Sequence, residues 1–176
     1  HDGQTAAELR DIAARIGAIA QANRHIQQSL PGLSEDGDLG LFLEVLSREL
    51  LPLCPQGGLI DVECPPIPLA RERLVSIGHL ITELVLNAVK SGAARIDLRG
   101  EMVGEKLRLC LDDDGPGLPE GFDPRESKGL GMAILHAMAE KVDAEVTWDR
   151  SPQGGARFIA EFPRDLKREQ RQATRS

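Results

Sequence analysis

Thr82-Glu83-Leu84-Val85-Leu86-Asn87-Ala88-Val89-Lys90 is the stretch of sequence that decides the fold of this chain. It forms the second half of a helix predicted from about Ala70 to Ser91, which Gly92 closes. When each residue is advanced by about 100° around the helix axis, the apolar side chains gather on one side. These side chains are Leu74, Ile77, Ile81, Leu84, Val85 and Ala88. The pattern predicts an amphipathic helix packed on a sheet.

The opposite side of the same helix carries a polar stripe. Glu83, Asn87 and Lys90 lie within about 40° of one another on the helical wheel, and His79 precedes them by one turn. Taken alone, such a stripe is typical of a solvated helix face. A carboxylate, an amide and an ammonium converge there, and segments further along the chain decide between a solvated face and a binding surface.

The segments around this helix alternate between helical and strand patterns. Asp38 can cap a helix that ends before Pro52, after a polar connection over residues 34–37. Another helix is predicted from about Gly129 to Val142, with His136 on its exposed side. Strands are predicted at residues 59–63, 95–99, 106–112, 144–149 and 156–162. This order indicates an α/β fold, a two-layer sandwich in which helices cover one face of the sheet.

The first part of the chain carries a different repeat. Its apolar positions recur three and four residues apart, a heptad seam that includes one polar member: Leu9, Ile12, Ile16, Ile19, Asn23, Ile26 and Leu30. Pro31 and Gly32 end this helix, so we divide the chain into residues 1–33, 34–165 and a charged tail over 166–176. A lone helix with an apolar stripe is marginal in water, so we expect it to pair and to form a homodimer.

The composition of the 176 residues describes one soluble globular core with a helical appendage. A net charge of -7 gives no long-range attraction to phosphate backbones or anionic lipid, which argues against nucleic acid and membrane as partners. No apolar run approaches the roughly 20 residues that span a bilayer, and nothing at the start reads as a signal peptide. We therefore expect a cytoplasmic location, although a full-length parent could be membrane-anchored. Cys54, Cys64 and Cys110 lack metal or disulfide spacing and are interpreted as packing residues.

Two glycine-rich segments follow the polar stripe. Asp113, Gly115 and Gly117 come directly after a predicted strand, where glycines permit positive φ and a close approach to a ligand. Gly129-Leu130-Gly131 opens a helix, whose free amides and dipole suit a polyphosphate, and Lys128 precedes it. Each pattern is also an ordinary turn or helix entry. Their order and spacing are what indicate a binding site.

These three segments together resemble the asparagine box and the two glycine boxes of the ATPase fold shared by gyrase, a heat-shock chaperone, histidine kinases and a mismatch-repair protein. The likeness covers roughly residues 34–163 and implies a Bergerat-type sandwich with a mixed sheet. Within that superfamily, two features are closest to histidine kinases of the HWE-like and second-type groups. One is the short loop between the two glycine boxes, and the other is Glu83. Residues 15–26 are similar to the second helix of their dimerisation hairpin.

The resemblance implies a role for each site residue. Asn87 would supply an oxygen to Mg²⁺ and Lys90 would neutralise phosphate charge, while Glu83 would act as a base or orienting group. Asp113 would bind the adenine amino group, in a pocket shaped by Gly115 and Gly117. Lys128, Gly129, Leu130 and Gly131 would hold the phosphates of ATP. Ala156 departs from the family, which often carries a Thr there, so the affinity for ATP is expected to be modest.

The resemblance also implies a sensor histidine kinase in a two-component pathway. The γ-phosphoryl group of MgATP would pass to a histidine of a dimerisation helix, and from there to the receiver domain of a response regulator. His1, His25, His79 and His136 lack the context of that acceptor, so we expect the acceptor helix to be missing. Two alternatives stay open: a serine kinase of the same fold that binds a sigma factor, and a degenerate, dimeric phosphotransfer scaffold.

Overall fold

The computed structural model describes residues 36–123 and 130–163, together with Arg10, Ala13, Gly17 and Ala20. These four single residues are helical. The residues of the predicted heptad seam, His25 and the tail lie outside the described residues, so the bundle helix and the dimer stay predictions. Among the described helices, none is both long enough and apolar enough to cross a bilayer.

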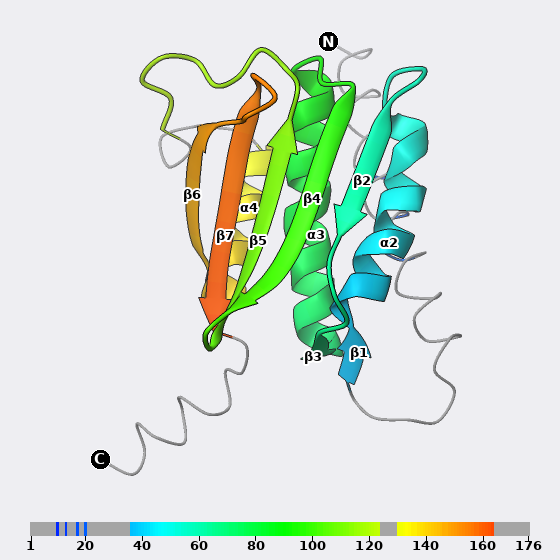
Figure 1. The fold of residues 1–176 in the computed structure, drawn as a ribbon, viewed down its shortest axis with the longest axis vertical. Coiled ribbons are helices and arrows are strands. Elements are labelled where there is room, and N and C mark those ends of the chain that lie inside the picture. Colours follow the sequence, from blue (N-terminus) through cyan, green and yellow to red (C-terminus); the bar gives the residue numbers. More distant parts are fainter. Residues whose placement is uncertain are drawn as a thin grey trace.

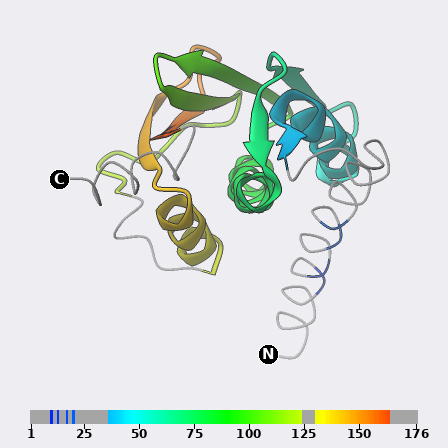
Figure 2. The same cartoon turned by 90° about the horizontal axis from the view of Figure 1, so that it is seen from below.

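The described chain forms a mixed sheet of five strands in the order β2-β4-β5-β7-β6. β2 (Leu59–Glu63) runs parallel to β4 (Arg95–Val103), and all other neighbours are antiparallel. The remaining strands are β5 (Lys106–Asp113), β6 (Glu145–Arg150) and β7 (Ala156–Pro163). Helices lie on one face of this sheet (Figures 1 and 2). The predicted two-layer α/β sandwich is confirmed.

Three helices make the second layer of the described chain: α2 (Leu39–Leu50), α3 (Arg71–Lys90) and α4 (Leu130–Lys141). A single 3-10 turn, η1 (Leu51–Leu53), follows α2. Alternation along the strands turns every second side chain toward the helices, which is why Leu107, Leu109 and Leu111 of β5 are buried. The predicted apolar face of α2 is fully buried as well: Leu39, Phe42, Leu43, Leu46 and Leu50.

A second, two-stranded sheet was not expected from the sequence. β1 (Asp36–Asp38) pairs antiparallel with β3 (Pro68–Ala70), so the predicted polar connection over residues 34–37 is wrong from Asp36 onward. Strands this short leave no period-2 pattern to find. The pairing joins the residues just before α2 to those just before α3, which fixes where both helices begin (Figure 1).

Helix α3 is the central element of the helical layer. Thr82 and Leu86, which lie outside its predicted apolar side, are buried as well as that side. Near its start, Arg73 donates from Nη2 to the carbonyl oxygen of Val142, just beyond the end of α4, at 3.3 Å. The Arg73 guanidinium also lies 5.2 Å from the ring centroid of Phe162 on β7. One buried arginine therefore ties α3 to α4 and to the sheet.

The cap of α2 gives a first prediction. The Asp38 side chain accepts a hydrogen bond from Leu41 N at 2.8 Å, which satisfies one of the free amides at the start of the helix. Asp38→Ala should lower the free energy of unfolding by about 1 kcal/mol in urea denaturation. Glu105→Ala, in the exposed turn between β4 and β5, is the control and should change it by less than about 0.5 kcal/mol. Equal effects of the two substitutions would contradict the capping role.

Candidate functional site

Three consecutive aspartates at the end of β5 point in different directions. Asp112 faces the side of the sheet without helices, where Arg157 Nε and Nη2 donate to its two oxygens at 2.7 and 2.8 Å. Asp113 faces the helical side and is 3% exposed. Asp114 begins the loop that follows. Because side chains of a strand alternate between its faces, only Asp113 of the three is aimed at the space between sheet and helices.

The Asp113 carboxylate is held by backbone amides from two separate segments. Its Oδ1 accepts hydrogen bonds from Gly115 N at 2.9 Å and from Ala156 N, at the start of β7, at 3.1 Å. Gly155 packs so closely on Asp113 that a Cβ at position 155 would overlap the carboxylate. Among the described residues no hydrogen bond to Asp113 Oδ2 is present, so this oxygen can accept one from a ligand.

The two glycines of the first predicted box serve different purposes. A Cβ on Gly115 would lie 3.0 Å from Asp113 Oδ1 and 3.6 Å from the Cβ of Ala93, in the turn that follows α3. Gly117 has a φ of +82°, a conformation that residues with a Cβ rarely adopt. The loop after β5 therefore lies directly against the end of α3, as the predicted site requires.

Asp114 fixes this arrangement from the outside. Its Oδ1 accepts hydrogen bonds from Arg95 N and Ala94 N, both at 2.8 Å. The amide of Arg95, with that of Ala94, holds the pKa of Asp114 below its ordinary value. The exposed side chain thus clamps the loop after β5 to the turn between α3 and β4.

The polar stripe of α3 is not a uniform solvated face. Glu83 is 2% exposed, Asn87 is half-buried and Lys90 is exposed. The interpretation as a solvated face is therefore wrong for Glu83, since the sequence pattern does not show what covers the far side of the helix. The stripe runs from the interior of the helical layer to the surface at the end of α3, which also borders Gly115.

Asn87 lies against the start of α4. Its Nδ2 donates to the sulfur of Met132 at 3.8 Å, a weak hydrogen bond. Leu130 and Gly131, the second half of the second glycine box, are the first residues of α4. Lys128 and Gly129 lie outside the described residues. The structure thus brings the asparagine helix next to both the first glycine loop and the beginning of α4.

His79 lies one helical turn before Glu83 and is half-buried. Burial, with a smaller contribution from the nearby Lys141, lowers the pKa of its imidazole below the ordinary value of 6.5. Lys141 is the last residue of α4, whereas Met132 lies in its first turn. His79 therefore lies near the opposite end of α4 from Met132. The position places His79 away from the glycine loops.

Two residues of the site were missed in the sequence. Neither Gly155, in the turn between β6 and β7, nor Asp114, in the first glycine loop, is among the site residues predicted from the sequence. The sequence shows a glycine pair at 154–155, but not that the backbone of Gly155 approaches a buried carboxylate. The register that brings Ala156 opposite Asp113 is a tertiary fact that the sequence does not display.

The donor set fits a magnesium-bound polyphosphate. Among the described residues, no three His, Cys, Asp or Glu side chains gather as a ready-made metal site. Mg²⁺ commonly takes one or two protein oxygens and completes its shell with phosphate and water. Asn87 carries an amide oxygen of the kind that Mg²⁺ prefers, and Lys90 carries a positive charge that suits a phosphate group.

A comparison with protein families gives an independent finding. The model described as "Histidine kinase-, DNA gyrase B-, and HSP90-like ATPase" matches residues 73–166. The matched part begins in the first turn of α3 and continues past β7, so it includes the polar stripe and both glycine segments.

Curated relatives are sensor kinases. Blue-light-activated histidine kinase 2 of Erythrobacter litoralis is 27% identical over 123 residues, which is 66% of this chain and 36% of that protein. Sensor histidine kinase PdtaS of Mycolicibacterium smegmatis is 25% identical over 186 residues, covering 91% of this chain and 37% of that protein. The chain spans about a third of the length of these relatives.

A solved structure shares the fold. The histidine kinase domain of the Erythrobacter litoralis EL346 blue-light activated histidine kinase gives a TM-score of 0.74 at 23% identity. The likeness covers 88% of this chain and 75% of that one.

The packing of Gly155 on Asp113 gives a second prediction. Gly155→Ala should lower the free energy of unfolding by more than about 2 kcal/mol, because the new methyl group displaces a buried, hydrogen-bonded carboxylate. Urea denaturation measures the change. Gly154→Ala is the matched control: position 154 has a φ of +100° but open space around it, so only backbone strain of about 1 kcal/mol is added. If the control destabilised as much as Gly155→Ala, steric overlap at Asp113 would not be the cause.

His79 gives a prediction about pH. Its lowered pKa in the folded chain means that the unfolded chain takes up a proton more readily once the pH falls below about 6.5. Wild-type stability should therefore fall as the pH passes from about 7.5 down through 6.5, until the folded imidazole is protonated as well. His79→Gln should lose less stability over the same window, as measured by thermal unfolding. A steeper loss in the variant would show that the sign is wrong.

Proposed function

Because the chain belongs to the family of histidine kinase-, DNA gyrase B- and HSP90-like ATPases, we propose that it binds MgATP and donates the γ-phosphoryl group to a histidine. The observation that carries the proposal is the convergence of three segments on one site. Asp113 joins the first glycine loop to β7, Ala93 lies against Gly115, and Asn87 contacts Met132 at the start of α4.

The adenine end of the site is the Asp113 carboxylate. Oδ1 is occupied by two backbone amides, which fixes the orientation of the carboxylate group. Oδ2 is then directed to accept the exocyclic amino group of adenine, which a guanine ring, with a carbonyl at that position, does not offer. Gly115 and Gly155, which both lie against Oδ1, add no side chain beside this carboxylate.

The phosphate end lies between the end of α3 and the beginning of α4. The amides at the start of α4, with Lys128 and Gly129 before it, would hold phosphate oxygens, as free amides at helix starts do for anions. Asn87 would hold Mg²⁺ through its amide oxygen, and the ion supplies charge neutralisation when bound. Lys90, exposed beyond Asn87, adds a second positive charge.

In the transfer step, an imidazole nitrogen would attack the γ-phosphorus of ATP in line with the bond to the β-phosphate oxygen. A phosphorus–nitrogen bond forms, the phosphorus–oxygen bond breaks, and ADP leaves with the electron pair. Such a step requires chiefly alignment and charge neutralisation. Glu83 precedes Asn87 by one helical turn and is buried. This position suits a carboxylate that orients a neighbouring group better than a base that contacts the acceptor. We propose that Glu83, the candidate catalytic residue, acts by orienting its neighbours in the transfer step.

Membership of this family also supports a proposal about the acceptor and the partner of the whole protein. We propose that the acceptor is a histidine on a dimerisation helix and that the receiver domain of a response regulator takes the phosphoryl group next. His79 is half-buried on α3 and His136 lies on α4, so neither is the acceptor in this proposal. Residues 1–33 would form part of the dimerisation hairpin, residues 34–165 the catalytic domain, and residues 166–176 a charged tail of a cytoplasmic module.

Isothermal titration calorimetry with MgATP tests the proposal. The wild-type chain should bind MgATP, and Asn87→Ala should weaken binding by at least about tenfold, because a ligand to the ion is lost. Gln56→Ala removes a similar amide from an exposed loop and should leave the affinity unchanged.

The transfer itself is tested in the longer parent chain with ATP labelled at the γ-phosphate. The proposal expects label on the protein that is stable in base and labile in acid, as for a phosphorylated histidine. Label stable in acid would favour a serine kinase of the same fold. No heat of binding from either the wild type or Gln56→Ala would favour the degenerate scaffold.

A further inference from the structure

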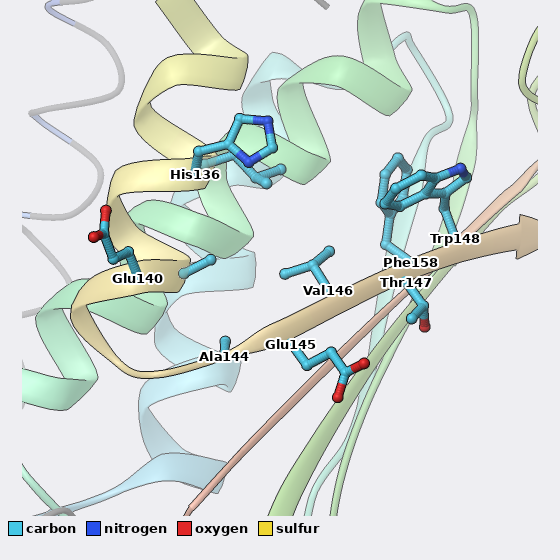
Figure 3. A pocket seen from close by; sticks show the side chains of 10 residues that line it. His136, Glu140, Ala144, Glu145, Val146, Thr147, Trp148 and Phe158 are labelled. Carbon is cyan, nitrogen blue, oxygen red and sulfur yellow. The ribbon is translucent and has the colours of Figure 1, made fainter. Parts of the chain in front are cut away.

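A hollow of about 680 Å³ lies between α4 and β6, away from the candidate ATP site. Its described lining is mainly apolar and comes from α4, β6 and β7: Leu135, Ala139, Val146, Trp148 and Phe158, with His136 at its side. Figure 3 shows Val146, Trp148, Phe158 and His136 around this space. Neither Asp113 nor Asn87 is among the described residues that line it. This volume is in the range of sites that hold a ligand or several side chains.

The strand beside the hollow is an edge of the sheet. Within the described chain β6 pairs with β7 alone, so its outer edge presents backbone amides and carbonyls without a partner strand. Such an edge can accept another extended segment by main-chain hydrogen bonds. Helix α4 lies across the hollow from β6, so a strand added at this edge would extend the sheet with one of its faces on the side of the hollow (Figure 2).

Side chains of β6 alternate between the hollow and the opposite face of the sheet, so those of an added strand would alternate in the same way. Val146 and Trp148 point toward the hollow, whereas Glu145 and Thr147, which also border it, point to the other side of the strand (Figure 3). Asp149 continues the outward series and is exposed. On an added strand, every second side chain would enter the apolar hollow, and those between would lie over Glu145 and Asp149. Glu140 adds a further exposed carboxylate on α4 beside the hollow.

We propose that the outer edge of β6 and the hollow beside α4 bind an extended protein segment in which apolar and basic residues alternate. The apolar side chains fill the space between Val146, Trp148 and Ala139. The basic side chains meet Glu145 and Asp149, and main-chain hydrogen bonds to β6 hold the register. This site is separate from the proposed ATP site and from its chemistry.

Protection of an edge strand is the simpler explanation for charges on β6, since charged side chains discourage pairing with other chains. That explanation accounts for Glu145 and Asp149 but not for the hollow. A protected edge has no need of a partly exposed tryptophan beside a mainly apolar hollow of about 680 Å³. The two features together favour selective pairing over general protection.

Fluorescence of Trp148 tests the proposal directly, because it is the only tryptophan of the chain. A short synthetic peptide of alternating lysine and valine, blocked at both ends, should change the emission of Trp148 in a saturable way. The counterpart of alternating glutamate and valine should bind at least about tenfold more weakly. Amide hydrogen exchange should slow at β6 on addition of the lysine peptide, which a ligand that only fills the hollow would not cause.

Two variants separate the apolar and the charged contributions. Val146→Lys places an ammonium in the hollow and should weaken peptide binding by at least about tenfold. Val103→Lys makes the same change at an exposed position at the end of β4 and should leave binding unchanged. The double variant Glu145→Gln and Asp149→Asn should lower the affinity by about threefold to tenfold at low salt and remove much of its salt dependence.

Three results would overturn the proposal. The first is an unchanged affinity in Val146→Lys that still unfolds at the wild-type temperature. The second is equal binding of the lysine and glutamate peptides. The third is self-association of the chain, seen by sedimentation and lost in Val146→Lys, because the face would then be covered by a second copy. MgATP affinity should be the same with and without the Val146→Lys change, so failure here leaves the proposed kinase function to its own test.

Discussion

The carboxylate of Asp113, enclosed between backbone amides of two different chain segments, is the contact on which the candidate site depends. A buried carboxylate without hydrogen bonds is destabilising by several kcal/mol. Here Gly115 N and Ala156 N both donate to Oδ1, and hydrogen bonds to a charged group contribute about 1.5–3 kcal/mol each. The arrangement is possible only because Gly155 has no side chain. The strand order, the glycine positions and the orientation of Asp113 Oδ1 therefore depend on one another.

The same strand end explains why the molecule has two layers. Asp112, on the face without helices, has a side chain only 2% exposed, because Arg157 and Arg99 cover it. Further ion pairs join Arg95 and Arg99 to Asp97 on that face. Polar side chains that satisfy one another make a surface that can face water, so no second layer of helices is needed there. Alternation along β5 therefore places Asp112 in this ion-paired face and Asp113 in the candidate site.

Much of this structure could be predicted from the sequence, since periodicity and capping are local. The strand Leu59–Glu63 and the buried face of α2 appear as expected, and Asp38 caps α2. What could not be predicted depends on contacts between distant segments. The polar stripe of α3 has the pattern of a solvated face, yet Glu83 is buried. His136, expected on an exposed side of its helix, is half-buried and lines the hollow beside β6. The short pair β1 and β3 has no sequence period at all.

Helix α4 extends from the candidate ATP site to the hollow at which we propose that a segment binds. Its first turns supply Met132 to the contact with Asn87, while Leu135 and Ala139 line the hollow beside β6. Its far end is fixed by Arg73, which donates to Val142 O. A packed helix moves as a unit, so a bound segment that shifted α4 at the hollow would also shift Met132 next to Asn87, which a substitution on β6 alone does not do. Thermodynamic linkage makes such an effect reciprocal: whatever coupling free energy a segment on β6 exerts on nucleotide binding, the nucleotide exerts equally on the segment.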